Sequence, residues 1–246
     1  NYIPFLYQAG GAIYVPETGD VVLDSPEAID AMAFYSALYQ EDLVYPGISS
    51  PFIGVAPYWG VEDEFLSAFA DRRVAILFLG PSMYDRLLDR MGLAPSSPGP
   101  VEVHTLPAGP KGQATIGMVR GFAVTGKPDQ PLSEATRLFL EYMTGPEAMR
   151  FWIGGPDDST SYIPALESGQ EQWLATHNYA TAFQREIEYL QPKPPYPVRY
   201  GGAVMFEFED AAPLMMDAML GKQTPEDVVK QLDEKVKATV GEHRIR

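Results

Sequence analysis

The sequence has 246 residues, of which 46% are hydrophobic and 12% aromatic, so a disordered chain is excluded and a folded core is expected. The 33 acidic residues outnumber the 18 basic ones, and the net charge of −15 argues against nucleic acid and anionic membranes as partners. The absence of cysteine excludes disulfides and zinc–thiolate sites. The opening stretch "NYIPFLYQAGG" has no signal-peptide pattern, so we expect that a preceding segment has been removed.

The first elements of the chain carry clear turn and capping signals. Residues 18–20, Thr-Gly-Asp, lie between two apolar stretches and predict a short hairpin. Ser25 followed by Pro26 predicts a helix start, because serine caps a helix and proline is suited to its first position. A loop rich in proline, glycine and serine follows that helix.

The middle of the chain reads as helix, strand, helix. Apolar residues recur every four positions over 61–69 and predict an amphipathic helix. The continuous apolar run at 74–79 predicts a buried strand of an α/β sheet. Gly80 and Pro81 then open a second helix, and the spacing of Tyr84 with the later leucines predicts that this tyrosine is buried in the core.

The remaining elements continue this alternation. Strands are expected at 101–106 and 115–124, and helices at 133–152, 170–190, 205–220 and 224–240. Phe139, Phe151 and Trp152 stand at helical spacing and are predicted to be core residues. Alternating helices and strands predict an α/β fold with a largely parallel sheet.

The strand-to-helix junction "LFLGPSMY" fits no catalytic motif. It lacks the lysine of a phosphate-binding loop and the second glycine of a nucleophile elbow. The histidines and acids show no metal-ligand spacing, so no metal, cofactor or catalytic residue is predicted. Acids such as Glu207 and Glu209 leave a glycoside hydrolase as an alternative function. Such an enzyme needs two carboxylates at a set distance, and that distance is not given by the sequence.

Aromatic residues in loops are the stronger signal. Trp59, Tyr162, Tyr196 and Tyr200 all stand in stretches rich in proline, glycine or polar residues. Aromatic rings stack on the C–H faces of sugars, whose hydroxyls need hydrogen-bonding partners. The alternative is that these rings fasten loops to the body of the protein.

The order of several motifs resembles the family 1 extracellular solute-binding proteins of bacterial ABC importers, the sugar-binding group that includes the maltose-binding proteins. No single motif is specific, but eight occur in the family's order over the whole chain. They are residues 9–11, 24–28, 68–80, 106–112, 117–124, 139–147, 163–164 and 221–228.

The resemblance implies a type II periplasmic-binding-protein-like α/β fold with two lobes and hinge crossovers. Residues 1–118 and 173–246 would form the second lobe and residues 119–172 would return to the first, whose N-terminal part is absent from this chain. It also implies a non-enzymatic protein that closes its lobes on a carbohydrate and delivers it to ABC permease transmembrane subunits. The implied location is periplasmic or extracellular, with lipoprotein anchoring. A sugar-sensing receptor domain and a glycan-active hydrolase remain the alternatives.

The resemblance implies a ligand-binding cleft lined by both aromatic and polar side chains. They are Trp59, Ser82, Met83, Arg120, Gly121, Tyr162, Tyr200, Glu207 and Phe208. Ser82 stands where maltose-binding relatives carry a stacking aromatic, and Phe208 falls at their second stacking position. Glu207 would accept hydrogen bonds from sugar hydroxyls. Arg120 would donate to an acidic or phosphorylated sugar, unless it pairs with a surface acid.

Overall fold

A computed structural model describes residues 2–15, 18–41, 61–96, 99–117, 121–122, 124–125, 130–152, 162–192 and 211–242. The chain divides into two compact units: unit 1 is Asn1–Phe65, Leu106–Met118 and Tyr189–Arg246, and unit 2 is Leu66–Thr105 and Val119–Glu188. This division places residues 66–105 in the same unit as residues 119–188. The lobe assignment from sequence instead placed residues 66–105 in the second lobe, with the rest of 1–118, and residues 119–172 in the first lobe. That assignment concerns a longer, two-lobed protein and stays a prediction.

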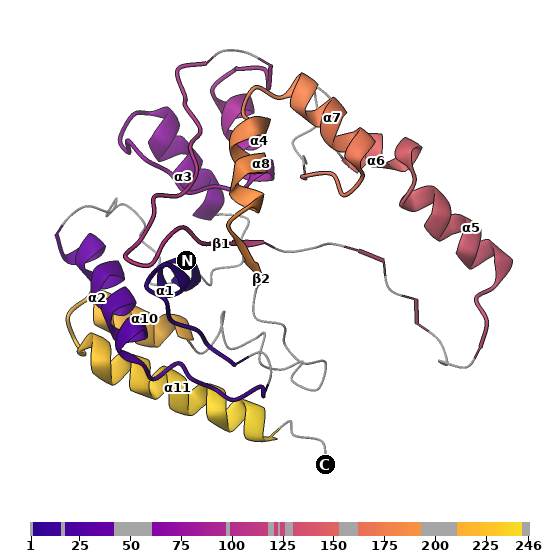
Figure 1. The fold of residues 1–246 in the computed structure, drawn as a ribbon. Helices are drawn as coiled ribbons and strands as arrows, with labels where there is room; N and C mark the ends of the chain where they lie inside the picture. The colour runs from indigo at the N-terminus through magenta and orange to yellow at the C-terminus, as the bar shows by residue number, and fades with distance from the viewer. Residues whose placement is uncertain are drawn as a thin grey trace. The chain divides into compact units, whose positions relative to one another are not determined.

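Unit 1 is built mainly from helices. They are α1 (Ile3–Gln8), α2 (Pro26–Gln40), α10 (Ala211–Met219) and α11 (Pro225–Glu242). The predicted start of α2 is confirmed, because the amide of Ala28 donates to Ser25 Oγ at 3.2 Å. Helices α2, α10 and α11 pack against one another, and α1 packs against α2 (Figure 1).

The core of unit 1 gathers apolar side chains from all four helices. Its fully buried members include Leu6, Met32, Val228 and Leu232. Tyr2 is also buried, its hydroxyl donates to the Ala28 carbonyl at 2.8 Å, and burial raises the pKa of its phenol above the ordinary tyrosine value. The described helices of unit 1 therefore enclose one continuous apolar core, which we call the closed core of unit 1.

The described part of unit 1 holds one small parallel sheet. Strand β1 (Thr115–Gly117) pairs with β2 (Leu190–Pro192). The strand predicted at 115–124 is observed over its first three residues, and residues 118–120 and 123 lie outside the described ones. The predicted hairpin is confirmed as a turn: Tyr14 and Val21 form an antiparallel bridge around residues 18–20.

Unit 2 contains shorter helices. They are the second half of α3 (Val61–Ala70), α4 (Pro81–Arg90), α5 (Glu134–Met143), α6 (Pro146–Trp152), α7 (Glu167–Thr176) and α8 (Ala180–Ile187). The single helix predicted at 170–190 is two, because the backbone leaves the helical path at His177, whose φ and ψ are −122° and 112°. Helices α5 and α6 follow each other in chain and space (Figure 1).

The predicted buried strand at 74–79 is wrong. These residues adopt no strand, and Ile76 is 73% exposed while Leu77 and Leu79 pack against the unit 2 core. A strand needs a hydrogen-bonding neighbour, and the described residues supply none to this segment. The apolar run is therefore buried only in part, through Leu77 and Leu79.

Two further expectations are wrong. Residues 101–106 form no strand in the structure. Phe139 on α5 and Phe151 on α6 are 54% and 75% exposed, so they are not core residues. No side chain of α5 is buried. The side chain of Trp152 lies outside the described residues.

Candidate functional site

The start of α4 carries two of the predicted site residues, Ser82 and Met83. Gly80 precedes the helix in extended conformation, and its carbonyl accepts the amides of Met83 and Tyr84, each at 3.1 Å. Pro81 has no N–H, and the amide of Ser82 has no acceptor within the helix. No described atom lies within 4 Å of the position that a Cβ on Gly80 would occupy. The junction therefore presents a hydroxyl and a backbone donor beside open space.

Ser82 and Met83 differ in their surroundings. Both are partly buried, but the Met83 side chain packs against the apolar core of unit 2. Its sulfur also accepts from the Arg86 guanidinium at 3.7 Å. Met83 is thus engaged in packing, and the polar group at this helix start is that of Ser82. A hydroxyl and an N–H at the positive end of a helix favour a ligand oxygen.

Tyr84 is a core residue, as its spacing predicted. It is 5% exposed, its hydroxyl donates to the Val101 carbonyl at 3.4 Å, and its ring meets that of Tyr179 with centroids 4.6 Å apart. Burial, together with the negative charge of Asp85, raises the pKa of the Tyr84 phenol. Tyr84 is therefore part of the core and does not offer its ring to a ligand at this helix start.

A buried polar cluster lies one turn into α4, and sequence reasoning missed it. Asp85 is 4% exposed, and its Oδ1 accepts a hydrogen bond from the Tyr179 hydroxyl. The second oxygen, Oδ2, and the indole N–H of Trp173 are buried without hydrogen-bond partners. The available signal was an aspartate inside the apolar face that runs from Tyr84 to Leu88.

The other predicted site residues are less defined. Gly121 is exposed, with no described atom within 4 Å of a Cβ built on it, and Tyr162 is partly buried. Five predicted residues lie outside the described ones: Trp59, Arg120, Tyr200, Glu207 and Phe208. The predicted site as a whole is therefore not tested by the structure.

Two searches of the described residues concern other functions. No group of three or more histidine, cysteine, aspartate or glutamate side chains in these ranges is placed to hold a metal ion. None of the described helices combines the length and apolarity that crossing a membrane requires.

The solved structures that this chain resembles share one fold. No family model matches the sequence, and a search of curated proteins finds no match. Among solved structures, an ABC transporter solute-binding protein from Thermotoga lettingae bound with alpha-D-tagatose is 20% identical, with a TM-score of 0.66 over 98% of this chain. Maltose-bound MalE3 of T. maritima is 19% identical, with a TM-score of 0.67 over 96%.

A third solved structure shows the same similarity in fold. The GacH receptor of Streptomyces glaucescens, solved unliganded and with acarbose, is 15% identical, with a TM-score of 0.68 over 98% of this chain. In all three comparisons the chain spans 56% of the other protein's length. The 246 residues thus have the fold of the corresponding part of a type II periplasmic binding protein.

Proposed function

We propose that this chain is part of the substrate-binding component of an ABC importer, which binds a carbohydrate by lobe closure. The observation that carries the proposal is the fold likeness over 96–98% of the chain to proteins solved with tagatose, maltose or acarbose. The neighbouring proteins are binding proteins rather than enzymes, which supports a role without catalysis.

The start of α4 supports the same function. The Ser82 hydroxyl and the amide donors at this helix start suit the oxygens of a sugar, and the open space at Gly80 leaves room for a ligand. The sequence motifs add stacking by Trp59, Tyr162, Tyr200 or Phe208, and polar contacts from Arg120, Gly121 and Glu207. With serine in the place of an aromatic, the ligand is held on this side chiefly by polar contacts.

The mechanism that we propose is a population shift. Lobe closure brings sugar-binding groups from both lobes into contact with the same ligand. The ligand therefore stabilises the closed state, which the permease recognises. Residues 119–172 would belong to the first lobe, completed by an N-terminal segment, and the rest of the chain to the second. Such a protein works outside the cytoplasmic membrane, in the periplasm or anchored there as a lipoprotein, beside its permease subunits.

A thermal-shift panel on the protein at its full natural length tests the function. Tagatose, maltose, maltotetraose, acarbose, laminaribiose and a sugar phosphate are added separately, with glycerol as a control. A saccharide at 100 times its Kd stabilises the folded state by about 2.7 kcal/mol, so a rise in Tm is expected for at least one of them. A panel in which no saccharide raises Tm above the glycerol control would contradict the proposal.

The same samples separate transport binding from hydrolysis. A binding protein returns its ligand unchanged, whereas a hydrolase that uses two acids releases shorter sugars. Chromatography of maltotetraose after prolonged incubation is expected to show the intact sugar. Time-dependent appearance of maltose or glucose would favour the hydrolase.

A further inference from the structure

The inference concerns the buried face of α4 and rests on the proposed function. Asp85 follows Ser82 by three residues, so the two lie within one turn of the same helix. The described residues include two buried aspartates, Asp85 and Asp233, at 4% and 3% exposure. Asp233 pairs with the Lys237 ammonium at 2.6 Å, whereas no described cation pairs with Asp85.

Asp85 is buried, so its single hydrogen bond determines how costly the burial of its carboxylate is. Oδ1 accepts from the Tyr179 hydroxyl, and Oδ2 is buried with no partner. A buried carboxylate is costly unless it is hydrogen-bonded. The Tyr179 hydroxyl is thus the one described group that offsets this cost, and α4 is held where that hydroxyl reaches it.

Tyr179 is well fixed for this role. It is 3% exposed and directly precedes α8. Its ring contacts the rings of Tyr84, Trp173, His177 and Phe183, with centroid distances between 4.6 and 6.2 Å. These contacts anchor the Tyr179 hydroxyl against α4, α7 and α8. The hydroxyl can therefore act as a fixed reference point for the first turns of α4.

We propose that Asp85 and Tyr179 are positioning residues for ligand binding: their hydrogen bond holds the first turn of α4 so that Ser82 and the free amide at the helix start face the sugar. Neither residue touches the ligand. Loss of the hydrogen bond leaves a buried charge without a partner, and α4 moves to reach water or another donor. The donors at the helix start then no longer match the sugar hydroxyls.

The test is Tyr179→Phe in the protein at its full natural length, with the saccharide that gives the largest thermal shift. Phenylalanine keeps the ring contacts and removes only the hydroxyl. Sugar Kd is expected to rise about tenfold, the effect of losing one hydrogen bond between the displaced helix start and the sugar. Hydrogen exchange of the peptide that covers residues 80–90 is expected to become faster, with or without sugar.

A matched control separates position from stability. Leu66→Val trims a fully buried side chain in the same cluster without touching α4 polar groups, and it lowers Tm while leaving Kd unchanged well below Tm. The double variant Asp85→Leu with Tyr179→Phe removes both polar groups, so Tm is expected to recover while Kd stays raised.

The outcomes distinguish this inference from the function on which it rests. A wild-type protein that binds no saccharide overturns the proposed function. A wild-type protein that binds sugar, with Tyr179→Phe matching its Kd, overturns the inference alone. Recovery of Kd together with Tm in the double variant also overturns it, because a structural role would then explain both.

Discussion

The two units differ in how completely they bury their apolar side chains. Among the described residues, the large hydrophobic side chains exposed in unit 1 are Phe34, Leu190 and Leu220. The described part of unit 2 is about the same size and exposes more than three times as many: Ile76, Phe78, Phe122, Val124, Leu132, Leu138, Phe139, Tyr142, Phe151 and Ile187. The described helices of unit 1 cover one another, whereas in unit 2 helices α4, α7 and α8 share a core and α5 buries none of its side chains.

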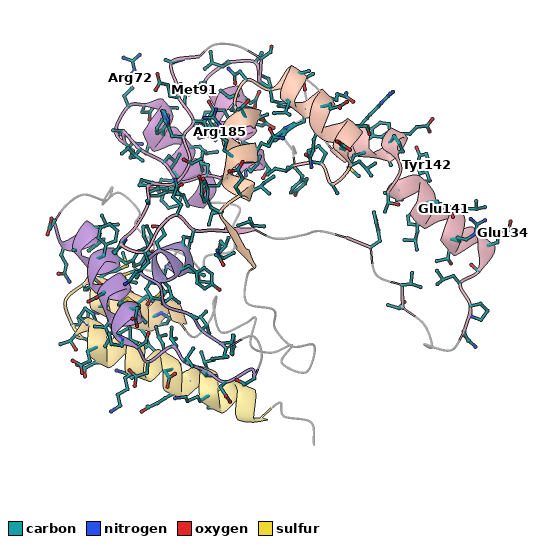
Figure 2. The ribbon with its side chains drawn as sticks, in the orientation of Figure 1. Arg72, Met91, Glu134, Glu141, Tyr142 and Arg185 are labelled. Atoms are coloured by element: carbon teal, nitrogen blue, oxygen red, sulfur yellow. The ribbon has the colours of Figure 1, made fainter. Side chains whose placement is uncertain are left out.

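Helix α5 shows the difference most directly. Its main helix contact is with α6, and Glu134, Glu141 and Tyr142 project from it along its length (Figure 2). A helix of ten residues is marginal in water, and most helices in proteins are stabilised by packing of an apolar face. In unit 1 that packing is present for α2 and α11. The comparison of the two units therefore shows how much the stability of a helix depends on the elements packed against it.

The buried charges repeat the contrast. In unit 1, Asp233 accepts from the Asp24 amide at 3.3 Å as well as from Lys237. In unit 2, Asp85 has one partner and one unpaired oxygen. A buried charge with several partners is well compensated, whereas one with a single partner depends on that partner.

The largest expected effect compares one leucine from each unit. Leu232 on α11 is 2% exposed, and Leu138 on α5 is 51% exposed. Leu232→Ala is expected to lower the free energy of unfolding by about 2–5 kcal/mol, because it removes buried methylenes and leaves a cavity. Leu138→Ala is expected to change it by less than about 0.5 kcal/mol. Urea unfolding measures both, and equal losses would break the comparison.

The second prediction concerns pH and the Asp233–Lys237 pair. The hydrogen bond and the negative charge of Asp233 raise the pKa of Lys237 above the ordinary lysine value of 10.5. Because the folded-state pKa lies above the unfolded one, the pair's stabilisation is complete below about pH 10.5 and is lost as pH rises through the folded pKa.

Urea unfolding of wild type and Lys237→Met between pH 8 and 12 measures this effect. The wild type is expected to be more stable than the variant at pH 8, and the gap is expected to close at the alkaline end. Lys230→Met is the matched control, because Lys230 is an exposed lysine on the same helix. A gap of constant size over the whole range would contradict the prediction.

Local signals in the sequence gave correct elements. Ser25 and Pro26 correctly predicted the start of α2, and the helix predicted to end at residue 220 ends at Met219, shortly before Gly221, whose φ is +68°. The helical spacing of Tyr84 correctly predicted its burial. These features depend on a few neighbouring residues, so the sequence alone contains the necessary information.

Non-local features could not be read in the same way. Apolar patterning at 74–79 and on α5 indicates which side chains favour burial, but it does not show which element covers them. The hydrogen bond between Asp85 and Tyr179 joins residues 94 positions apart, and no local motif marks it. The aromatic and polar residues of the candidate site stand in separate stretches of the sequence, so the prediction that they meet in one cleft rests on the family resemblance alone.

The smallest expected effect compares two phenylalanines of equal exposure. Phe34 on α2 and Phe139 on α5 are each 54% exposed. Phe139 has exposed Leu138 and Tyr142 beside it and meets Phe122 edge-on with centroids 6.1 Å apart, whereas the ring of Phe34 lies 5.6 Å from Phe5 beside the closed core of unit 1. Contiguous exposed apolar area binds hydrophobic dyes and promotes association, and single exposed side chains do neither.

Phe139→Ser is therefore expected to lower the fluorescence of bound anilinonaphthalene sulfonate in the 246-residue chain, and Phe34→Ser to leave it nearly unchanged. Each substitution is expected to shift the free energy of unfolding by about 0.5 kcal/mol or less, since neither side chain is buried. The dye signal then reports the local apolar patch rather than global loosening of the fold. An equal fall in dye binding for both variants would show that the exposed hydrophobic surface is spread over the two units, and the contrast between them would no longer hold.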